Sequence, residues 1–333
     1  MEHTPLALDA VAQALPELRQ QYGEEKVRQQ LSALEQHGDA VEDAMLWLRT
    51  ALAHGFKFMS IERVAQCPCG SRDIHRLSRF VFWNLLGVSQ CGHCGLLFVS
   101  PRLSQPSMRR IFDEFYIDPS QSDAWGRRRI PVFRDITRLL RRYQCARVFD
   151  VGTAFGHFLA WLTEAGFHAE GCEAAEPLVA WGRSHLGVRI HQGILRELDL
   201  PRGGFDCVVA LDTFYYVDDP VAELAALSQL VPPGGHLILR LRNARGALNR
   251  ARAESRKPVG RAIMPMEHLW YFTPATVQRL LGDSGWQVCL VEPSMYAGIP
   301  LALPAVAANR FVSARFGWPV LTHSFNIVAK RQV

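Results

Sequence analysis

The spacing of hydrophobic positions changes along this chain and separates a helical beginning from an alternating remainder. Up to about residue 60, apolar residues such as Leu15, Leu18 and Leu31 recur at helical spacing among polar residues, which predicts helices. From residue 145 onward, short apolar runs alternate with amphipathic stretches, which predicts strands and helices in turn. Such alternation is typical of a mostly parallel sheet with helices on both faces.

Seven strands and four helices are predicted in this second part. The strands cover residues 146–151, 167–172, 188–191, 205–211, 235–241, 286–292 and 323–330. The helices cover residues 156–165, 175–185, 220–230 and 274–284. We therefore expect an α/β domain over 145–333, preceded by a helical cap over 1–60, a cysteine-rich module over 61–105 and a helical linker or lid over 106–144.

Composition and charge are those of a soluble globular protein. Hydrophobic residues make up 48% of the chain and charged residues 21%, which is ordinary for that class. The formal net charge of +5 is too small to imply nucleic acid by itself. The sequence shows neither an apolar run of about 18 residues, as a membrane span requires, nor the pattern of a secretory signal. We expect a cytoplasmic protein whose eight cysteines are thiols rather than disulfides.

A glycine-containing turn follows the first predicted strand of the α/β domain. Asp150 and Gly152 end the apolar run, and Gly156 begins the next helix. Glycine lets the backbone turn with positive φ and lets a ligand approach the main chain. Glu173 ends the second strand about 20 residues further on, where a carboxylate can accept both ribose hydroxyls of an adenosine ligand. Ala154 replaces the middle glycine of a dinucleotide-binding turn, so NAD is less favoured than a ligand without a pyrophosphate.

In these features the chain resembles the class I S-adenosylmethionine (SAM)-dependent methyltransferases. Their first motif looks like residues 150–156, and their acidic end of strand two is matched by Glu173. Residues 205–212, 232–235 and 267–273 are similar to their later motifs and occur in the family's order. The resemblance covers about 145 to 330 and implies a Rossmann-like fold, SAM as cofactor and transfer of a methyl group.

By position, the resemblance implies a SAM site at the strand ends. Glu173 would bind the ribose, and Asp212 would lie near the methionine end. The backbone of Ile194 would receive the adenine amine, because Gly193 and Ile194 stand where relatives often carry an acid. Asp150 is interpreted as support for the turn. The implied set is Asp150, Gly152, Ala154, Gly156, Glu173, Ala174, Ile194 and Asp212.

The catalytic residues are less clearly indicated. Tyr216 stands where many relatives carry a histidine, which removes the usual general base. The candidates are His268, Tyr216 and Tyr215, with His268 the first choice as base because histidine needs the least pKa adjustment. The tyrosine rings could also hold a cationic ligand. Two simpler interpretations stay open: the tyrosines wall the adenosine pocket, and His268 is a hydrogen-bonded structural histidine.

Four of the cysteines form a cluster. Cys67 and Cys69 precede a glycine, and Cys91 and Cys94 form a regular C-x-x-C pair after 21 intervening residues. Two thiolate pairs on glycine turns predict a tetrahedral structural zinc site, with a metal-free thiol cluster as the alternative. The first pair is one residue short, so His93 is a candidate substitute ligand. Four sulfurs would leave no open position for catalysis.

The cysteine cluster carries a second resemblance. Residues 69–71 and 91–102 are similar to the cysteine-rich beginning of many small-molecule methyltransferases, including some that act on sugars and natural-product intermediates. The likeness joins the first part of the chain to the same family. It implies a small-molecule substrate of secondary metabolism, in particular a sugar-like or acidic intermediate.

A basic segment follows the fifth strand of the α/β domain. Residues 240–261 contain eight basic residues and one acid, and they leave the sheet at the edge where ligands bind in open α/β folds. The segment could clamp an anionic or carrier-bound substrate, or it could be a solvated loop. Aromatic residues are not interleaved in it, so nucleic acid is not the favoured partner.

The sequence thus predicts a SAM-dependent methyltransferase of small molecules with a structural zinc ion. Three alternatives stay open: an enzyme of this fold that catalyses non-methyl alkyl transfer or cyclisation, an RNA-binding methyltransferase, and a non-catalytic SAM-binding protein. The oligomeric state is not predicted.

Overall fold

The computed structural model of the protein describes a defined part of the chain. The described residues are 16, 19–20, 24–25, 60–79, 87–109, 119–245, 268–294, 306–311 and 324–332. The chain divides into two compact units. The first consists chiefly of residues up to Tyr116 together with Gly246–Trp270, and the second chiefly of Ile117–Arg245 and Tyr271–Val333.

A seven-stranded sheet forms the centre of the second unit. Its strand order is β12-β13-β10-β9-β6-β7-β8. Strands β10, β9, β6, β7 and β8 are parallel neighbours, whereas β13 runs antiparallel to both β10 and β12. The bounds are β6 Arg147–Val151, β7 His168–Glu173, β8 Ile190–Gln192, β9 Cys207–Leu211, β10 His236–Arg242, β12 Trp286–Pro293 and β13 Ser324–Arg331. The carboxyl ends of the parallel strands therefore meet at one edge of the sheet.

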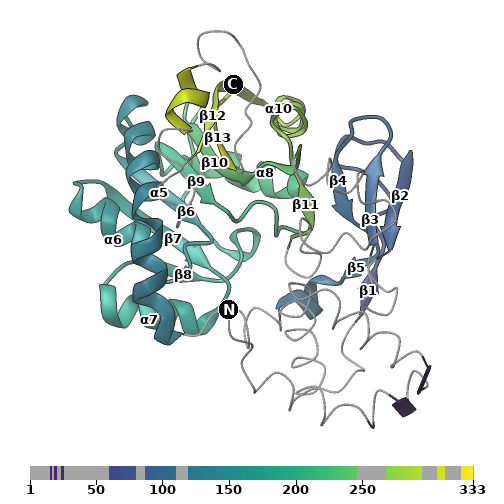
Figure 1. Ribbon diagram of the computed structural model, residues 1–333. Helices are drawn as coiled ribbons and strands as arrows, with labels where there is room; N and C mark the ends of the chain where they lie inside the picture. The colour runs from purple at the N-terminus through teal and green to yellow at the C-terminus, as the bar shows by residue number, and fades with distance from the viewer. Residues whose placement is uncertain are drawn as a thin grey trace. The chain divides into compact units, whose positions relative to one another are not determined.

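Helices cover both faces of this sheet. In Figure 1, α5, α6 and α7 lie on one side of the strands, and α8 and α10 lie on the other. Local sequence signals start two of them: Asp219 accepts hydrogen bonds from Val221 N and Ala222 N at 2.9 and 3.0 Å, and Thr273 forms a capping box with Thr276. The bounds are η2 Pro119–Gln121, α5 Ser122–Arg142, α6 His157–Glu164, α7 Glu176–Leu186, η3 Leu195–Glu197, α8 Pro220–Leu230 and α10 Pro274–Asp283.

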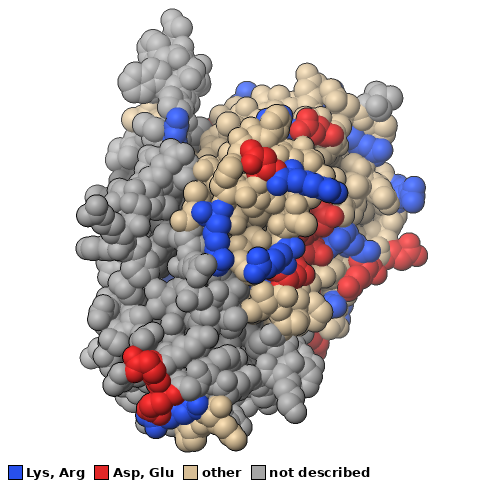
Figure 2. Space-filling view, turned by 90° about the vertical axis from the view of Figure 1, so that its right-hand side faces the viewer, with Lys and Arg blue, Asp and Glu red and all other residues tan. Residues whose placement is uncertain are grey.

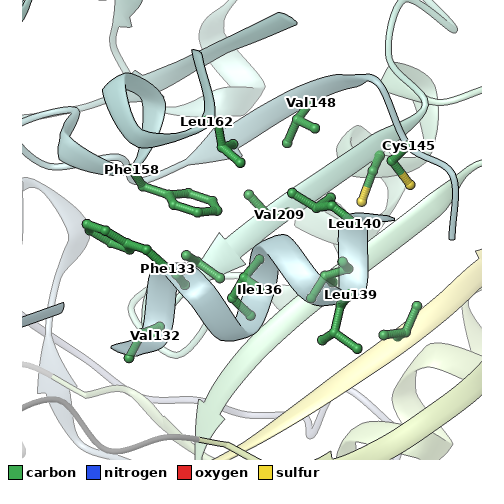
Figure 3. Packing of buried hydrophobic residues seen from close by; sticks show 14 residues of the cluster. Val132, Phe133, Ile136, Leu139, Leu140, Cys145, Val148, Phe158, Leu162 and Val209 are labelled. Carbon is green, nitrogen blue, oxygen red and sulfur yellow. The ribbon is translucent and has the colours of Figure 1, made fainter. Parts of the chain in front are cut away.

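The long helix α5 is anchored to the sheet by its apolar face. Ile136 is fully buried with Val148 of β6 and Val209 of β9, and Phe133 meets Phe158 of α6 at 5.1 Å between ring centroids (Figure 3). Truncating a side chain this well packed typically costs about 2–5 kcal/mol. The position of α5 over the strands is therefore set by packing.

A buried ionic network also anchors α5. Asp135, which is 5% exposed, accepts hydrogen bonds from Arg310 at 2.6 and 2.7 Å and from Asn326 at 3.0 Å. Arg138 donates to both Asp135 and Glu292. Buried charges of both signs are thus paired, as burial requires. The network connects α5 with β12, β13 and the segment 306–311.

The cysteine-rich part of the chain forms two small sheets. One pairs β1 Ile61–Glu62 with β5 Arg102–Leu103 in antiparallel orientation. The other has the strand order β11-β4-β3-β2, with bounds β2 Ile74–Arg79, β3 Gly87–Cys91, β4 Leu97–Val99 and β11 Trp270–Tyr271. The hairpin of β3 and β4 encloses the second cysteine pair.

The predicted α/β, Rossmann-like fold with a mostly parallel seven-stranded sheet is confirmed. All seven predicted strands and all four predicted helices are present, with ends shifted by no more than two residues. The helical cap over 1–60 lies almost entirely outside the described residues. The division at residues 60, 105 and 144 stays a prediction.

Candidate functional site

The residues predicted for the ligand site in the second unit lie at or directly after the carboxyl ends of its parallel strands. They follow β6, β7, β8 and β9 in turn. Backbone hydrogen bonds connect these strand ends: Gly152 N donates to Cys172 O at 2.8 Å, and Gly193 N donates to Glu173 O at 2.9 Å. The sheet therefore gathers Asp150, Gly152, Ala154, Gly156, Glu173, Ala174, Ile194 and Asp212 along one edge.

The glycine turn after β6 depends on left-handed backbone conformations. Gly152, Ala154 and Gly156 have φ values of 72°, 50° and 80°. A Cβ atom on Gly152 would lie 2.4 Å from the side chain of Thr213, so no larger residue fits there. Ala154 adopts a backbone conformation that residues other than glycine rarely adopt. Because this conformation suits glycine, the structure explains why position 154 is a glycine in the motif that the turn resembles.

Glu173 fixes this turn from the neighbouring strand. Its Oε2 accepts a hydrogen bond from Ala154 N at 2.9 Å, and its Oε1 accepts one from Ala175 N at 3.0 Å. A carboxylate has about four acceptor sites, so these two backbone bonds orient the group without using all of them. The geometry is compatible with a carboxylate that receives two hydroxyl groups of a ligand.

Three buried polar atoms beside the turn make no hydrogen bond among the described residues. They are Asp150 Oδ1, Thr153 Oγ1 and Arg129 Nε. Burial raises the pKa of the Asp150 carboxyl to about 7, and the nearby Thr153 hydroxyl and Arg129 charge offset only part of this rise. Buried polar atoms are normally paired, so such a group marks the place of a ligand or of ordered water. One acid, one hydroxyl and one guanidinium together complement a ligand that carries charges of both signs.

Asp212, by contrast, is already paired. It has a left-handed φ of 62° at the end of β9, and its carboxylate accepts hydrogen bonds from Arg129 Nη2 at 2.8 Å and from Arg240. Burial opposes its ionisation, but the charges of Arg240 and Arg129 hold the pKa of its carboxyl below the usual range. Asp212 is therefore an anion held between two arginines.

Aromatic side chains surround the turn. The guanidinium carbon of Arg129 lies 4.6 Å from the ring centroid of Trp125, a cation–π contact, and Trp125 meets Phe155 edge-on at 5.9 Å. The rings of Tyr215 and Tyr216 lie 4.8 Å apart, and Tyr215 is only 4% exposed. The role of these tyrosines in catalysis stays a prediction, as does the alternative that they wall the adenosine pocket.

Sequence reasoning did not assign Arg129, Thr153 or Arg240 to this site. Arg129 lies in a run of three arginines over 127–129, within the predicted helical linker. Its position three residues before Val132 and seven before Ile136 puts it on the buried face of α5, and this spacing could have identified it. Thr153 and Arg240 give no comparable indication, because their roles depend on neighbours from other strands.

The structure gives the positions of the remaining predicted site residues, and their roles stay predictions. Ile194 precedes η3 in extended conformation, and Ala174 follows β7 directly. His268 is buried, at 3% exposure, and belongs to the first unit. Its role as a base stays a prediction.

The four predicted zinc ligands are brought together. The sulfur atoms of Cys67, Cys69, Cys91 and Cys94 all lie within 4.8 Å of one another, and the Cys67 and Cys94 sulfurs are 3.5 Å apart. A zinc ion with bonds of about 2.3 Å to four sulfurs would set them about 3.8 Å apart, so the cluster has the right size. His93, the predicted substitute ligand, is not part of this group.

Most of the basic segment over 240–261 lies outside the described residues, which include it only as far as Arg245. On the face shown in Figure 2, basic and acidic side chains of the described residues are intermixed rather than separated. In the part of the chain that the structure describes, no helix combines the length and the apolar character needed to cross a bilayer.

A family model of known proteins matches the chain. Residues 124–291, half of the chain, match the model described as a methyltransferase domain. The match starts within α5 and ends within β12, and it includes every strand end of the candidate site.

Curated relatives are similar over shorter stretches. A ubiquinone biosynthesis O-methyltransferase of Xanthomonas axonopodis is 27% identical over 159 residues, which cover 45% of this chain and 66% of the relative. Another protein of that name, from Aromatoleum aromaticum, is 32% identical over 97 residues, which cover 27% of this chain and 42% of the relative. The chain thus matches less than two thirds of the length of these relatives.

Solved structures are similar to the chain at low sequence identity. A 1,6-didemethyltoxoflavin-N1-methyltransferase of Burkholderia thailandensis is 18% identical, with a TM-score of 0.48, 73% of this chain covered and 97% of that chain covered. A SAM-dependent methyltransferase of Aquifex aeolicus is 17% identical, with a TM-score of 0.43, 64% of this chain covered and 98% of that chain covered.

Proposed function

Because this chain belongs to the methyltransferase-domain family, we propose that it transfers the methyl group of SAM to a hydroxyl group of a small molecule. The chain is a SAM-dependent methyltransferase. The choice of a hydroxyl acceptor is supported by the curated relatives, which are named O-methyltransferases. Sugar-like and acidic intermediates are the first acceptors to test, because of the resemblance of the cysteine-rich segment.

The group of unpartnered polar atoms beside the glycine turn carries the SAM assignment. The methionine end of SAM has an ammonium and a carboxylate, and these match Asp150 and Arg129 in charge. Thr153 Oγ1 adds a neutral hydrogen-bonding group three residues after Asp150. The residues present therefore fit the amino-acid end of SAM.

The same edge provides for the rest of the ligand. Glu173, held in place by its bonds from Ala154 N and Ala175 N, binds the ribose hydroxyls. Ala174 lies beside it in the chain, and the backbone near Ile194 receives the adenine. When bound, SAM supplies a methyl group activated by its positively charged sulfur. The chain's contribution is to orient that group and to exclude water, since positioning supplies much of the rate of an in-line displacement.

His268 is the proposed proton acceptor for the hydroxyl, and Tyr215 and Tyr216 line the pocket beside the sulfur. A histidine titrates near neutral pH and so can accept a proton there. A hydroxyl needs such a base because it is poorly ionised at neutral pH. Replacement of His268 by Gln should lower kcat more than it raises the KM for SAM.

The binding site is tested with Glu173→Ala and calorimetric titration of S-adenosylhomocysteine. Loss of two charge-assisted hydrogen bonds predicts a Kd about a hundredfold higher. Glu176→Ala, an exposed acid at the start of α7, is the matched control and should leave the Kd unchanged. Equal affinities of Glu173→Ala and wild type would contradict the assignment.

Turnover is tested by incubation with SAM and candidate hydroxylated acids, followed by mass spectrometry. S-adenosylhomocysteine together with a methylated acceptor supports the proposal. Methylthioadenosine in its place would indicate that the chain uses the other arm of SAM. Methylation of RNA but of no small molecule would overturn the substrate class.

We also propose that the four clustered cysteines bind a structural zinc ion. Their sulfur spacing supports this role, and four sulfur ligands leave no open coordination position. Protein purified without chelator should contain about one zinc per chain by elemental analysis, and Cys94→Ser should lose it. Zinc at background level in the wild type would contradict the assignment.

A further inference from the structure

Arg240 is a buried cation that no motif assigns. It lies on β10 with 3% of its surface exposed, and its Nε donates a hydrogen bond to Ser294 Oγ at 3.1 Å. Its neighbours in register are Leu211 on β9 and Asn326 on β13, so strands on both sides fix its position. Burial of a guanidinium in this way requires an anion nearby.

That anion is Asp212, which Arg240 shares with Arg129. Nη1 of Arg240 donates to both carboxylate oxygens of Asp212, while Nη2 of Arg129 donates to one of them at 2.8 Å. The backbone strengthens the arrangement, because Asp212 N donates to Arg240 O at 3.0 Å. Three charged side chains from α5, β9 and β10 thus form one cluster with two positive charges and one negative charge.

Asp212 neutralises only one of the two arginines, and we assign the remaining positive charge to Arg129. Arg240 is held by both Asp212 oxygens and by Ser294, whereas Arg129 contacts Asp212 through one nitrogen and leaves its Nε without a hydrogen bond among the described residues. If Arg240 were absent, Asp212 would be a buried anion with Arg129 as its main partner. A planar guanidinium would then turn to form a two-bond pair with the carboxylate.

We propose that Arg240 is a positioning residue that neutralises Asp212 and thereby keeps Arg129 available for the carboxylate of SAM. The inference rests on the proposed function only in that Arg129 binds the carboxylate. Arg240 itself touches neither SAM nor the acceptor. It acts through the shared carboxylate of Asp212.

The test compares two ligands that differ in the amino-acid end. S-adenosylhomocysteine carries the carboxylate and the ammonium, whereas methylthioadenosine carries neither. In Arg240→Gln, the Kd for S-adenosylhomocysteine should rise about tenfold and the Kd for methylthioadenosine should stay within about twofold, because only the first ligand depends on Arg129. A merely structural role would raise both values by the same factor.

A double-mutant cycle with Asp212→Asn tests the mechanism. In the Asp212→Asn background Arg129 has no anion to turn to, so Arg240→Gln should change the Kd for S-adenosylhomocysteine by less than about twofold. Arg240→Lys, which keeps the charge but not the planar fork, should recover part of the lost affinity. A tenfold loss in both backgrounds would overturn the proposal.

Arg310→Gln is the matched control. It also removes an arginine from a partly buried ionic network of the second unit, but that network surrounds Asp135 rather than the candidate site. It should lower thermal stability without changing the ratio of the two Kd values. If Arg129→Gln leaves the ratio of the Kd for S-adenosylhomocysteine to the Kd for methylthioadenosine unchanged, the proposed carboxylate site is wrong. If Arg129→Gln raises this ratio and Arg240→Gln does not, only the role of Arg240 is wrong.

Discussion

The carboxyl ends of β6 and β9 are neighbouring regions of the same sheet, and each carries an aspartate with a different environment. Asp150, at the end of β6, is 2% exposed and has an oxygen without a hydrogen bond among the described residues. Asp212, directly after β9, is held by Arg129 and Arg240. Burial raises the pKa of the first carboxyl to about 7, whereas the two arginines outweigh burial and keep that of the second below its usual range.

The difference indicates that the two aspartates have different roles in the proposed binding site. Asp150 has one oxygen without a hydrogen bond among the described residues, and in the proposed site this oxygen meets the ammonium of the ligand. Asp212 is satisfied in the free protein and organises the arginines around it. Burial alone would raise the pKa of both, so the cation partners decide the outcome. In the proposed function, the β6 end therefore meets the ligand, and the β9 end holds the residues that meet it.

The largest expected effect is an opposite change of stability in two aspartate-to-asparagine variants. The raised pKa of Asp150 means that its stabilising contribution, complete below pH ~4, is lost as pH rises through about 7. The lowered pKa of Asp212 means that its contribution is present above pH ~4 and lost as pH falls below that value. At pH 8, Asp212→Asn should therefore lower the free energy of unfolding by about 3 kcal/mol, and Asp150→Asn should raise it by about 1–3 kcal/mol.

Denaturant titration of the ligand-free protein at pH 8 and pH 5 measures both effects. The gain from Asp150→Asn should shrink at pH 5, where the wild-type carboxyl is protonated. If both variants changed the free energy of unfolding in the same direction at pH 8, the proposed difference between the ends of β6 and β9 would be wrong.

A somewhat smaller effect is expected for ligand affinity in Arg129→Gln. Loss of charge-assisted hydrogen bonds to a carboxylate predicts a Kd for S-adenosylhomocysteine about 10 to 100 times higher. Arg128→Gln is the control, because Arg128 belongs to the same arginine run but is exposed and donates a hydrogen bond to Ala124 O of its own helix. Calorimetry that finds equal losses in both variants would point to general charge rather than to a specific site.

The pH dependence of affinity tests Asp150 separately. Only the ionised carboxylate attracts the ligand's ammonium, and its pKa is about 7 in the free protein. The Kd for S-adenosylhomocysteine should therefore rise about eightfold to tenfold from pH 7.5 to pH 6. In Asp150→Asn the Kd should be nearly constant over this range, and a slope equal to that of the wild type would mean that another group titrates.

The smallest effect is expected for Thr153→Val. Its hydroxyl interacts only weakly with the Asp150 carboxyl, whose pKa it lowers, so its removal should change stability only slightly. Affinity for S-adenosylhomocysteine should fall about threefold if the hydroxyl bonds to the ligand. An unchanged Kd would restrict the ligand contacts to Asp150 and Arg129.

The sequence predicted the fold well because its elements are locally encoded. Apolar periodicity located the seven strands of the large sheet and the helices α6, α7, α8 and α10, and the glycine turn with Glu173 predicted the edge at which the candidate site lies. The cysteine pairs were predicted from spacing alone, and their sulfurs do lie together. These features depend on residues close in sequence or on a regular strand order.

What the sequence could not predict depends on contacts between distant elements. Arg129 lies 83 positions before Asp212, and only the packing of α5 on the sheet brings them together. The pairing of Arg240 with Asp212 depends likewise on the register of β9 against β10. The spacing from Val132 and Ile136 places Arg129 on the buried face of α5, but it does not indicate which acid of the sheet Arg129 meets. The unpartnered oxygen of Asp150 is visible only once its neighbours are placed.

The most direct test of the ligand site is the affinity of the wild-type protein for two adenosine ligands, measured by calorimetry at pH 7.5. If Asp150 and Arg129 bind the amino-acid end of SAM, S-adenosylhomocysteine should bind about a hundredfold more tightly than methylthioadenosine. Equal affinity for the two ligands would contradict this account, because the β6 and β9 ends would then contribute nothing to recognition.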